Sequence, residues 1–136
     1  MLRVVLDTNV LVSAAIVQGK QFEILRLAKL GKIKVITSPE IIKEFEEVIS
    51  REKFGFSKEQ IANAAKQVLE IAEIVIPQKK LEIIKEDSDD NMILECACES
   101  NADCIISGDP HLLALKSYEN IEIVNATNFF NNLYKP

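Results

Sequence analysis

The sequence predicts an α/β fold in which helices cover a central parallel sheet. Short apolar, β-branched runs recur along the chain, beginning with Val4-Val5-Leu6, as in strands buried on both faces. Helical patterns separate these runs, which is the order of a parallel sheet with right-handed crossovers. The chain has 136 residues, of which 48% are hydrophobic, enough for one sizeable core. We therefore expect one domain, spanning 1–136.

Each element has a local reason in the sequence. Strands are expected near 4–6, 33–37, 73–76, 103–107 and 121–124. Helical patterns fall at 10–17, 22–28, 39–49, 57–72, from 89 or 90 to 97, at 112–115 and at 127–134. Ser38-Pro39 is typical of a helix start, with Ser as the cap and Pro as the first helical residue. Ser57 followed by Gln60 predicts a capping box. The polar segment 78–88 stays unassigned.

Composition excludes several classes of protein. No apolar run approaches the roughly 20 residues of a membrane span, and we expect neither a signal peptide nor a membrane association. Three cysteines without a disulfide-framework spacing favour a reducing, cytoplasmic setting, and the single histidine disfavours a zinc site. The net charge of −5 has the wrong sign for binding nucleic acid by bulk electrostatics. Such binding would need bound cations or local basic patches.

Two expected strands end in an acid. Asp7 follows Val4-Val5-Leu6, and Asp109 follows the strand near 103–107. Parallel strands place both acids at the carboxyl edge of the sheet, where open α/β folds bind ligands. Asp90 starts the helix that leads into the strand near 103–107, and it comes either from the opposite edge or from a loop folded over the top. Asp also favours helix caps, and we expect one of Asp89 or Asp90 to be a cap.

The helix over 39–49 offers a further acid. Its apolar stripe is flanked by Glu44 on one side and Glu46 on the other, each about one residue step from the centre of the stripe. Periodicity gives the two residues equal claims to a site, and a solvated face remains the alternative for both.

These acids form a candidate cluster without His or thiolate. Hard oxygen ligands of this kind suit Mg²⁺ or Mn²⁺. Carboxylates held close together repel unless a cation or a proton intervenes. Two-metal phosphodiester hydrolysis is the chemistry that requires such a cluster, and it needs no nucleophilic side chain.

Four segments of the chain, in order, resemble the four motifs of a PIN domain. Each segment alone is a weak signal, but four in the right order and spacing are specific, and they cover nearly the whole chain. The segments are Val5-Leu6-Asp7-Thr8-Asn9-Val10, the stretch 38–44, the stretch 87–97, and Ala102-Asp103-Cys104-Ile105-Ile106-Ser107-Gly108-Asp109. Within the family, the chain is most similar to the toxin components of toxin–antitoxin pairs, relatives of the VapC ribonucleases.

The resemblance implies both a fold and a site. The fold is a three-layer α/β/α sandwich, and the metal-binding, catalytic acids are Asp7, Glu44, Asp90 and Asp109, which selects Glu44 over Glu46. Ser107 stands where Thr is more usual in the family; this exchange keeps the hydroxyl.

Other residues are expected to support these acids. We expect Asn9 to orient Asp7 or a metal-bound water, although a helix cap is the alternative. Ser107 and Asp87 are expected to be supporting residues. We expect His111 to be structural or to face the substrate rather than to bind the metal.

The family resemblance also implies an activity and partners. It implies an endoribonuclease that uses Mg²⁺ or Mn²⁺ to cleave single-stranded RNA, a small antitoxin partner, and a homodimer or higher homo-oligomer.

Three alternatives compete with this interpretation. A haloacid-dehalogenase-type phosphatase would have a second Asp two residues after Asp7, where the chain has Asn9. A receiver domain would have an acid after its central strand, where Ile76 is followed by Pro77. The stronger alternative is a catalytically silent PIN-fold module that binds RNA or protein. Loss of one of the four acids would signal such a module, and all four are present.

Overall fold

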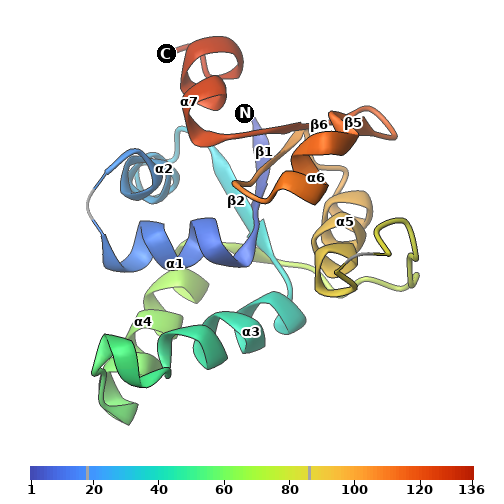
Figure 1. Cartoon of the computed structure of the whole chain (residues 1–136). Coiled ribbons are helices and arrows are strands. Elements are labelled where there is room, and N and C mark those ends of the chain that lie inside the picture. The colour runs from blue at the N-terminus through green and yellow to red at the C-terminus, as the bar shows by residue number, and fades with distance from the viewer. Residues whose placement is uncertain (18, 86) are drawn as a thin grey trace.

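A six-stranded sheet forms the centre of the structure, a computed structural model that describes residues 1–17, 19–85 and 87–136 (Figure 1). The strands are β1 (Arg3–Leu6), β2 (Lys34–Thr37), β3 (Glu73–Ile74), β4 (Cys104–Ile106), β5 (Ser117–Tyr118) and β6 (Ile121–Val124). Their order across the sheet is β3-β2-β1-β4-β6-β5. The N-terminal strand β1 therefore lies in the interior of the sheet, as its apolar sequence predicts.

Helices cover both sides of the sheet, which confirms the predicted three layers. They are α1 (Thr8–Ile16), α2 (Lys20–Lys29), α3 (Pro39–Ile49), α4 (Lys58–Ile71), α5 (Asp89–Ser100), α6 (Pro110–Leu115) and α7 (Ala126–Asn128), with the short 3-10 helix η1 (Glu52–Phe54) and the π-helix η2 (Phe129–Leu133). Figure 1 shows α1 and α2 on one side of β1 and β2, and α5 and α6 on the other. Of the helices in the described residues, none has the length and apolar character needed to span a membrane.

The sheet is mixed rather than parallel throughout, which corrects the sequence-based expectation. Strands β1, β2, β3, β4 and β6 are parallel, whereas the two-residue β5 pairs antiparallel with β6. Glu119 and Asn120 connect β5 to β6, and both have positive φ, 47° and 69°. This is the backbone of a tight two-residue hairpin turn. The hairpin was not predicted because its turn lacks the Asn-Gly or Asp-Gly pair that marks such turns most clearly.

The helix starts follow the predicted capping signals. Ser38 accepts a hydrogen bond from the Ile41 amide at 3.3 Å at the start of α3, and Pro39 is the first helical residue. Ser57 and Gln60 form the predicted capping box of α4. The last helix differs from the expected 127–134, because only the short α7 is α-helical before the chain widens into η2.

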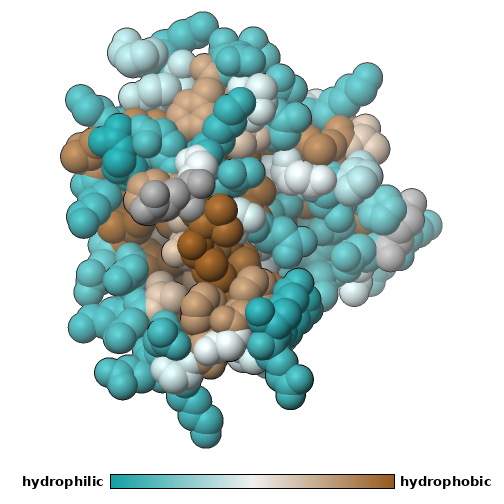
Figure 2. Space-filling model, turned by 60° about the vertical axis from the view of Figure 1, so that its left-hand side comes forward, coloured by the Kyte–Doolittle hydropathy of each residue, from teal (hydrophilic) through white to brown (hydrophobic). Residues whose placement is uncertain are grey.

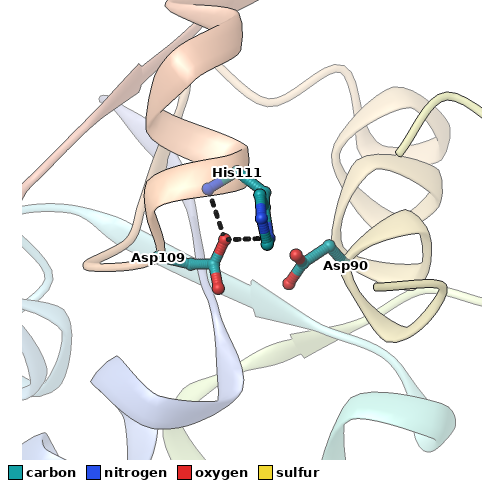
Figure 3. A group of neighbouring side chains, drawn as sticks. All are labelled: Asp90, Asp109 and His111. Carbon is teal, nitrogen blue, oxygen red and sulfur yellow. Dashed lines mark hydrogen bonds and ion pairs between the residues drawn. The ribbon is translucent and has the colours of Figure 1, made fainter. Parts of the chain in front are cut away.

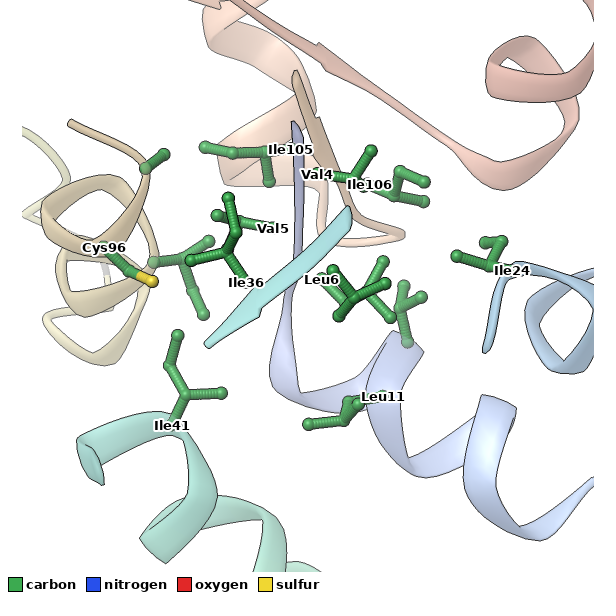
Figure 4. Packing of buried hydrophobic residues seen from close by; sticks show 14 of the residues in the cluster. Val4, Val5, Leu6, Leu11, Ile24, Ile36, Ile41, Cys96, Ile105 and Ile106 are labelled. Atoms are coloured by element: carbon green, nitrogen blue, oxygen red, sulfur yellow. The ribbon is translucent and has the colours of Figure 1, made fainter. Parts of the chain in front are cut away.

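The core confirms that β1 is buried on both faces. Val4, Val5 and Leu6 are at most 2% exposed. Figure 4 shows apolar side chains gathered on both sides of the central strands, with Cys96 of α5 on one side and Ile24 of α2 on the other. Among the cysteines, Cys96 and Cys104 are fully buried, as expected of small hydrophobic residues.

The register of the central strands positions the site. Val5 lies beside Ile105 and Leu6 beside Ile106, so the next residues, Asp7 and Ser107, leave the sheet side by side. The Asp7 amide still donates to the Ile106 carbonyl at 3.1 Å. Both polar residues therefore stand at the carboxyl edge of the sheet, held by the last bonds of its ladder.

Candidate functional site

An acidic cleft of about 300 Å³ opens at the carboxyl edge of the sheet. The residues lining it include all four acids named by the sequence and several neighbours: Asp7, Thr8, Asn9, Glu44, Glu47, Val48, Arg51, Asp87, Asp89, Asp90, Ile93 and Asp109. A water molecule occupies about 30 Å³ of liquid, so the cleft has room for a cation with several coordinated waters. Glu46, the other candidate on α3, does not line it.

Asp7 is fixed by both of its carboxylate oxygens and is only 5% exposed. Oδ1 accepts a hydrogen bond from the Val10 amide at 2.8 Å, which makes Asp7 the N-cap of α1. Oδ2 accepts a hydrogen bond from the Ser107 hydroxyl. The same hydroxyl oxygen accepts from the Asp109 amide at 2.9 Å. The Ser107 hydroxyl therefore links the Asp7 carboxylate to the backbone of Asp109.

Asp90 reaches the cleft from the start of α5. The chain leaves β3 at the carboxyl edge, and α5 begins at that edge before it returns toward the start of β4, so Asp90 does not come from the opposite edge. Neither Asp89 nor Asp90 is the N-cap, which is Ser88. Instead, the Asp87 carboxylate accepts from the Asp89 amide at 3.0 Å. The expected cap was therefore placed on the wrong acids, and Asp87 shapes the turn that presents Asp90.

Asp109 caps the short helix α6. Its Oδ1 accepts from the amides of His111 at 2.7 Å and Leu112 at 3.2 Å. The structure also brings His111, which the sequence analysis set apart from the metal ligands, next to the acids. One ligand atom each from Asp90, Asp109 and His111 lie within 4.8 Å of one another. Figure 3 shows these three side chains pointing toward a common space.

Three of the carboxyl groups have raised pKa values. Burial raises the pKa of Asp90 to about 7, with further contributions from the charges of Asp109, Asp87 and Asp7. Burial also raises the pKa of Asp7, against the opposing hydrogen bond from Ser107. These groups hold protons more tightly than ordinary carboxyl groups because each would otherwise place a negative charge in a buried, acidic setting.

Glu44 shows the same effect on the opposite wall of the cleft. Burial is the largest cause of its raised pKa, the Thr8 hydroxyl opposes the rise, and the nearby carboxyl groups of Asp89 and Asp87 add to it. The wall carried by α3 and the wall carried by the start of α5 therefore influence each other electrostatically.

The donor set fits a divalent cation. Oδ2 of Asp90 is buried and, among the described residues, has no hydrogen-bond partner, while the residue as a whole is 9% exposed. A buried carboxylate oxygen without a donor is costly unless a proton or a cation binds it. Its neighbours in the cleft are oxygen donors, which Mg²⁺ and Mn²⁺ accept.

The expected contact between Asn9 and Asp7 is not formed, and the expected role of Asn9 toward a metal-bound water stays a prediction. It lines the cleft and is exposed, but in the described parts of the chain it forms no hydrogen bond with Asp7. Ser107 makes the contact with the Asp7 carboxylate instead. Asn9 is not the cap of α1 either, since that position belongs to Asp7.

Two buried polar residues of α5 were missed by the sequence analysis. Asn91 and Glu95 are 5% and 6% exposed, and both bind the backbone of the segment that precedes the helix. Their spacing of four residues places them on one face of α5, which was the only available signal.

A second hollow is apolar and lies elsewhere. Figure 2 shows apolar side chains gathered on the face formed by α1, α2 and α4. The hollow there, of about 450 Å³, is lined by residues that include Ala14, Phe22, Leu25 and Val68. Among the described residues that line it, Glu70 is the one carboxylate. Clustered acids therefore distinguish the cleft at the sheet edge as the candidate for chemistry.

Comparisons with known proteins agree with this architecture. A chain in the crystal structure of VapBC2 from Rickettsia felis, bound to a DNA fragment from their promoter, has a similar fold, with a TM-score of 0.65 and 21% sequence identity. The match covers 91% of the present chain and 98% of that chain. A search of curated proteins found no match. The family model described as PIN domain matches residues 3–111, most of the sequence, and the chain belongs to the PIN domain family.

Proposed function

We propose that the chain is an endoribonuclease that hydrolyses phosphodiester bonds of single-stranded RNA with the help of Mg²⁺ or Mn²⁺. The observation that carries the proposal is the position of Asp7, Glu44, Asp90 and Asp109 around one cleft. PIN domain membership supports nuclease chemistry, and the buried, unpartnered oxygen of Asp90 supports a cation. We assign metal binding and catalysis to the four acids.

The roles of the residues follow from their contacts. The chemistry that a divalent cation supplies when bound in such a site is acidification of an attacking water and compensation of charge on the phosphate. Asp7 is suited to hold its position because both of its oxygens are fixed by hydrogen bonds. The Ser107 hydroxyl is suited to position both acids, because it donates to the Asp7 carboxylate and accepts from the Asp109 amide. Asp87 shapes the turn before Asp90.

We further propose that the protein is the toxin of a toxin–antitoxin pair and forms a homodimer or higher homo-oligomer. The similar fold in VapBC2, a complex of this kind, supports an antitoxin partner. A basic segment of that partner would place Arg or Lys against the carboxylates of the cleft, where charge-assisted hydrogen bonds are strong. Co-purification with the product of an adjacent small gene tests this. Isolation of the protein alone from its native host, with no such neighbouring gene, would count against it.

The activity is tested with purified protein and labelled single-stranded RNA, in Mn²⁺ and in EDTA. We expect cleavage in Mn²⁺ only, and its loss in Asp7→Asn, which removes a charge at almost constant volume. Asp103→Asn is the matched control, because Asp103 precedes β4 at the opposite edge of the sheet and should leave cleavage unchanged. Absence of cleavage by antitoxin-free protein with confirmed metal occupancy would favour the catalytically silent binding module.

A further inference from the structure

His111 lies where a metal ligand would lie. It is the second residue of α6, and its backbone amide donates to Asp109 Oδ1 at 2.7 Å. Its Nδ1 atom is 3.7 Å from the same oxygen. The two residues are therefore held close by the turn that starts the helix, and Figure 3 shows the imidazole between Asp109 and Asp90.

A second observation indicates a ligand in the space that these side chains share. Oδ2 of Asp90 is buried without a hydrogen-bond partner among the described residues, and the Asp90 carboxylate points toward the imidazole (Figure 3). Oxygen and nitrogen ligands of one ion at about 2.1 Å from it are at most about 4.2 Å apart. The ligand atoms of Asp90, Asp109 and His111 lie within 4.8 Å of one another, so small side-chain rotations bring all three to one ion.

We infer that His111 is a ligand of the cation held by Asp90 and Asp109, and that its imidazole gives the site a preference for Mn²⁺ over Mg²⁺. This inference rests on the proposed metal site and adds a nitrogen ligand to its four carboxylates. Mg²⁺ is a hard ion that strongly prefers oxygen, whereas imidazole binds the later transition ions increasingly well. A tethered imidazole therefore strengthens Mn²⁺ binding more than Mg²⁺ binding.

The composition of the chain makes the inference directly measurable. His111 is the only histidine in the sequence. In protein prepared without a histidine tag, an imidazole nitrogen bound to Mn²⁺ can come from no other residue. Pulsed electron paramagnetic resonance detects the coupling of such a nitrogen to the Mn²⁺ electron spins, and we expect this signal in the wild-type protein and its loss in His111→Gln.

Binding affinities give a second readout that does not depend on activity. We expect His111→Gln to weaken Mn²⁺ binding by at least about tenfold. This is the lower end of the loss seen when a residue that only hydrogen-bonds to a metal ligand is removed. Mg²⁺ binding, measured by competition against Mn²⁺, should change by less than about threefold. Ala114→Gln is the control, since it places the same side chain on the exposed surface of the same helix and should change neither affinity.

The outcomes separate this inference from the proposed function. RNA cleavage and Mn²⁺ binding without the nitrogen signal would overturn the role of His111 and leave the nuclease standing. Equal losses of Mn²⁺ and Mg²⁺ affinity in His111→Gln would overturn the selectivity. Failure of the wild-type protein to bind Mn²⁺ at millimolar concentration would overturn the metal site itself and the inference with it.

Discussion

The side chain of Asn91 binds the backbone of Ile84 as an adjacent strand would. Its Nδ2 donates to the Ile84 carbonyl at 2.8 Å, and its Oδ1 accepts from the Ile84 amide at 2.9 Å. The same Oδ1 accepts from the Ile83 amide at 3.0 Å. Glu95, one turn further along α5, accepts from the Leu81 amide at 2.8 Å. One face of α5 thus fastens an irregular segment that would otherwise leave buried backbone groups unpaired.

Replacing Asn91 should therefore destabilise the fold. Asn91→Ala removes three hydrogen bonds and leaves the buried backbone of Ile84 unsatisfied, and we expect a loss of about 2–4 kcal/mol in the free energy of unfolding. Urea denaturation monitored by circular dichroism measures it. Asn63→Ala, at an exposed position of α4, is the control and should stay within about 0.5 kcal/mol of the wild type. Equal stability of the two variants would show that the hydrogen bonds of Asn91 contribute nothing to the free energy of unfolding.

Ser107 should affect the site more than the fold. Its hydroxyl donates to Asp7 and accepts from the Asp109 amide, so Ser107→Ala leaves Asp7 without one of its two fixed contacts. We expect metal affinity and cleavage to fall by about 10- to 100-fold, the usual cost of removing a group that orients a metal ligand. Ser107→Thr keeps the hydroxyl and should retain most of both. A Thr variant as impaired as the Ala variant would contradict this role.

The stability of the metal-free protein should fall as pH rises from about 4 to about 7. Burial and neighbouring carboxylates raise the pKa of Asp90 from 3.8 to about 7, so the folded state binds more protons than the unfolded state within that window. Raising the pH therefore removes more protons from the folded state than from the unfolded state and lowers the free energy of unfolding. The raised pKa values of Asp7 and Glu44 act in the same direction.

Thermal melts in EDTA across this pH range measure the effect. Asp90→Asn removes the carboxyl group whose pKa is raised to about 7 and should flatten the dependence of the melting temperature on pH. Asp103→Asn keeps that group and should leave the dependence in place. A melting temperature that rises steadily from pH 5 to pH 7.5 in the wild type would mean that other groups dominate.

Cation binding should offset the repulsion between the crowded carboxylates and stabilise the folded state. A ligand that binds only the folded state adds about 2.7 kcal/mol of stability at 100 times its dissociation constant. The melting temperature should therefore rise with added Mn²⁺ or Mg²⁺ at pH 7.5. The double variant Asp7→Asn, Asp90→Asn should show no rise, and a rise equal to that of the wild type would place the bound ion elsewhere.

Strand ends made much of the site predictable from the sequence. Asp7 and Asp109 follow apolar runs, and parallel pairing forces their strands to end at one edge. Glu44 could not be separated from Glu46 by periodicity alone, because both flank the apolar stripe of α3; only the family motif selected it. The roles of these acids remain predictions.

The missed features share a physical cause. Asn91 and Glu95 are buried because an irregular segment covers them. That segment has no periodicity, so no pattern in the sequence predicts that it packs there. The hairpin before β6 escaped notice because Glu119 and Asn120 adopt positive φ without a glycine. In both cases no local sequence pattern marks the deciding contact, which is the covering segment for the helix and the pairing of β5 with β6 for the turn.

The ends of the cleaved RNA test the central claim most directly. The cleft holds the four candidate catalytic carboxylates among its acids, and the chain has one histidine, so it lacks the His pair that would serve as acid and base for attack by the RNA's own 2′-hydroxyl. Attack by a metal-activated water leaves 5′-phosphate and 3′-hydroxyl ends. We expect these ends from the wild-type protein in Mn²⁺. Ends with 2′,3′-cyclic phosphate and 5′-hydroxyl, or cleavage that survives both EDTA and Asp7→Asn, would contradict the account.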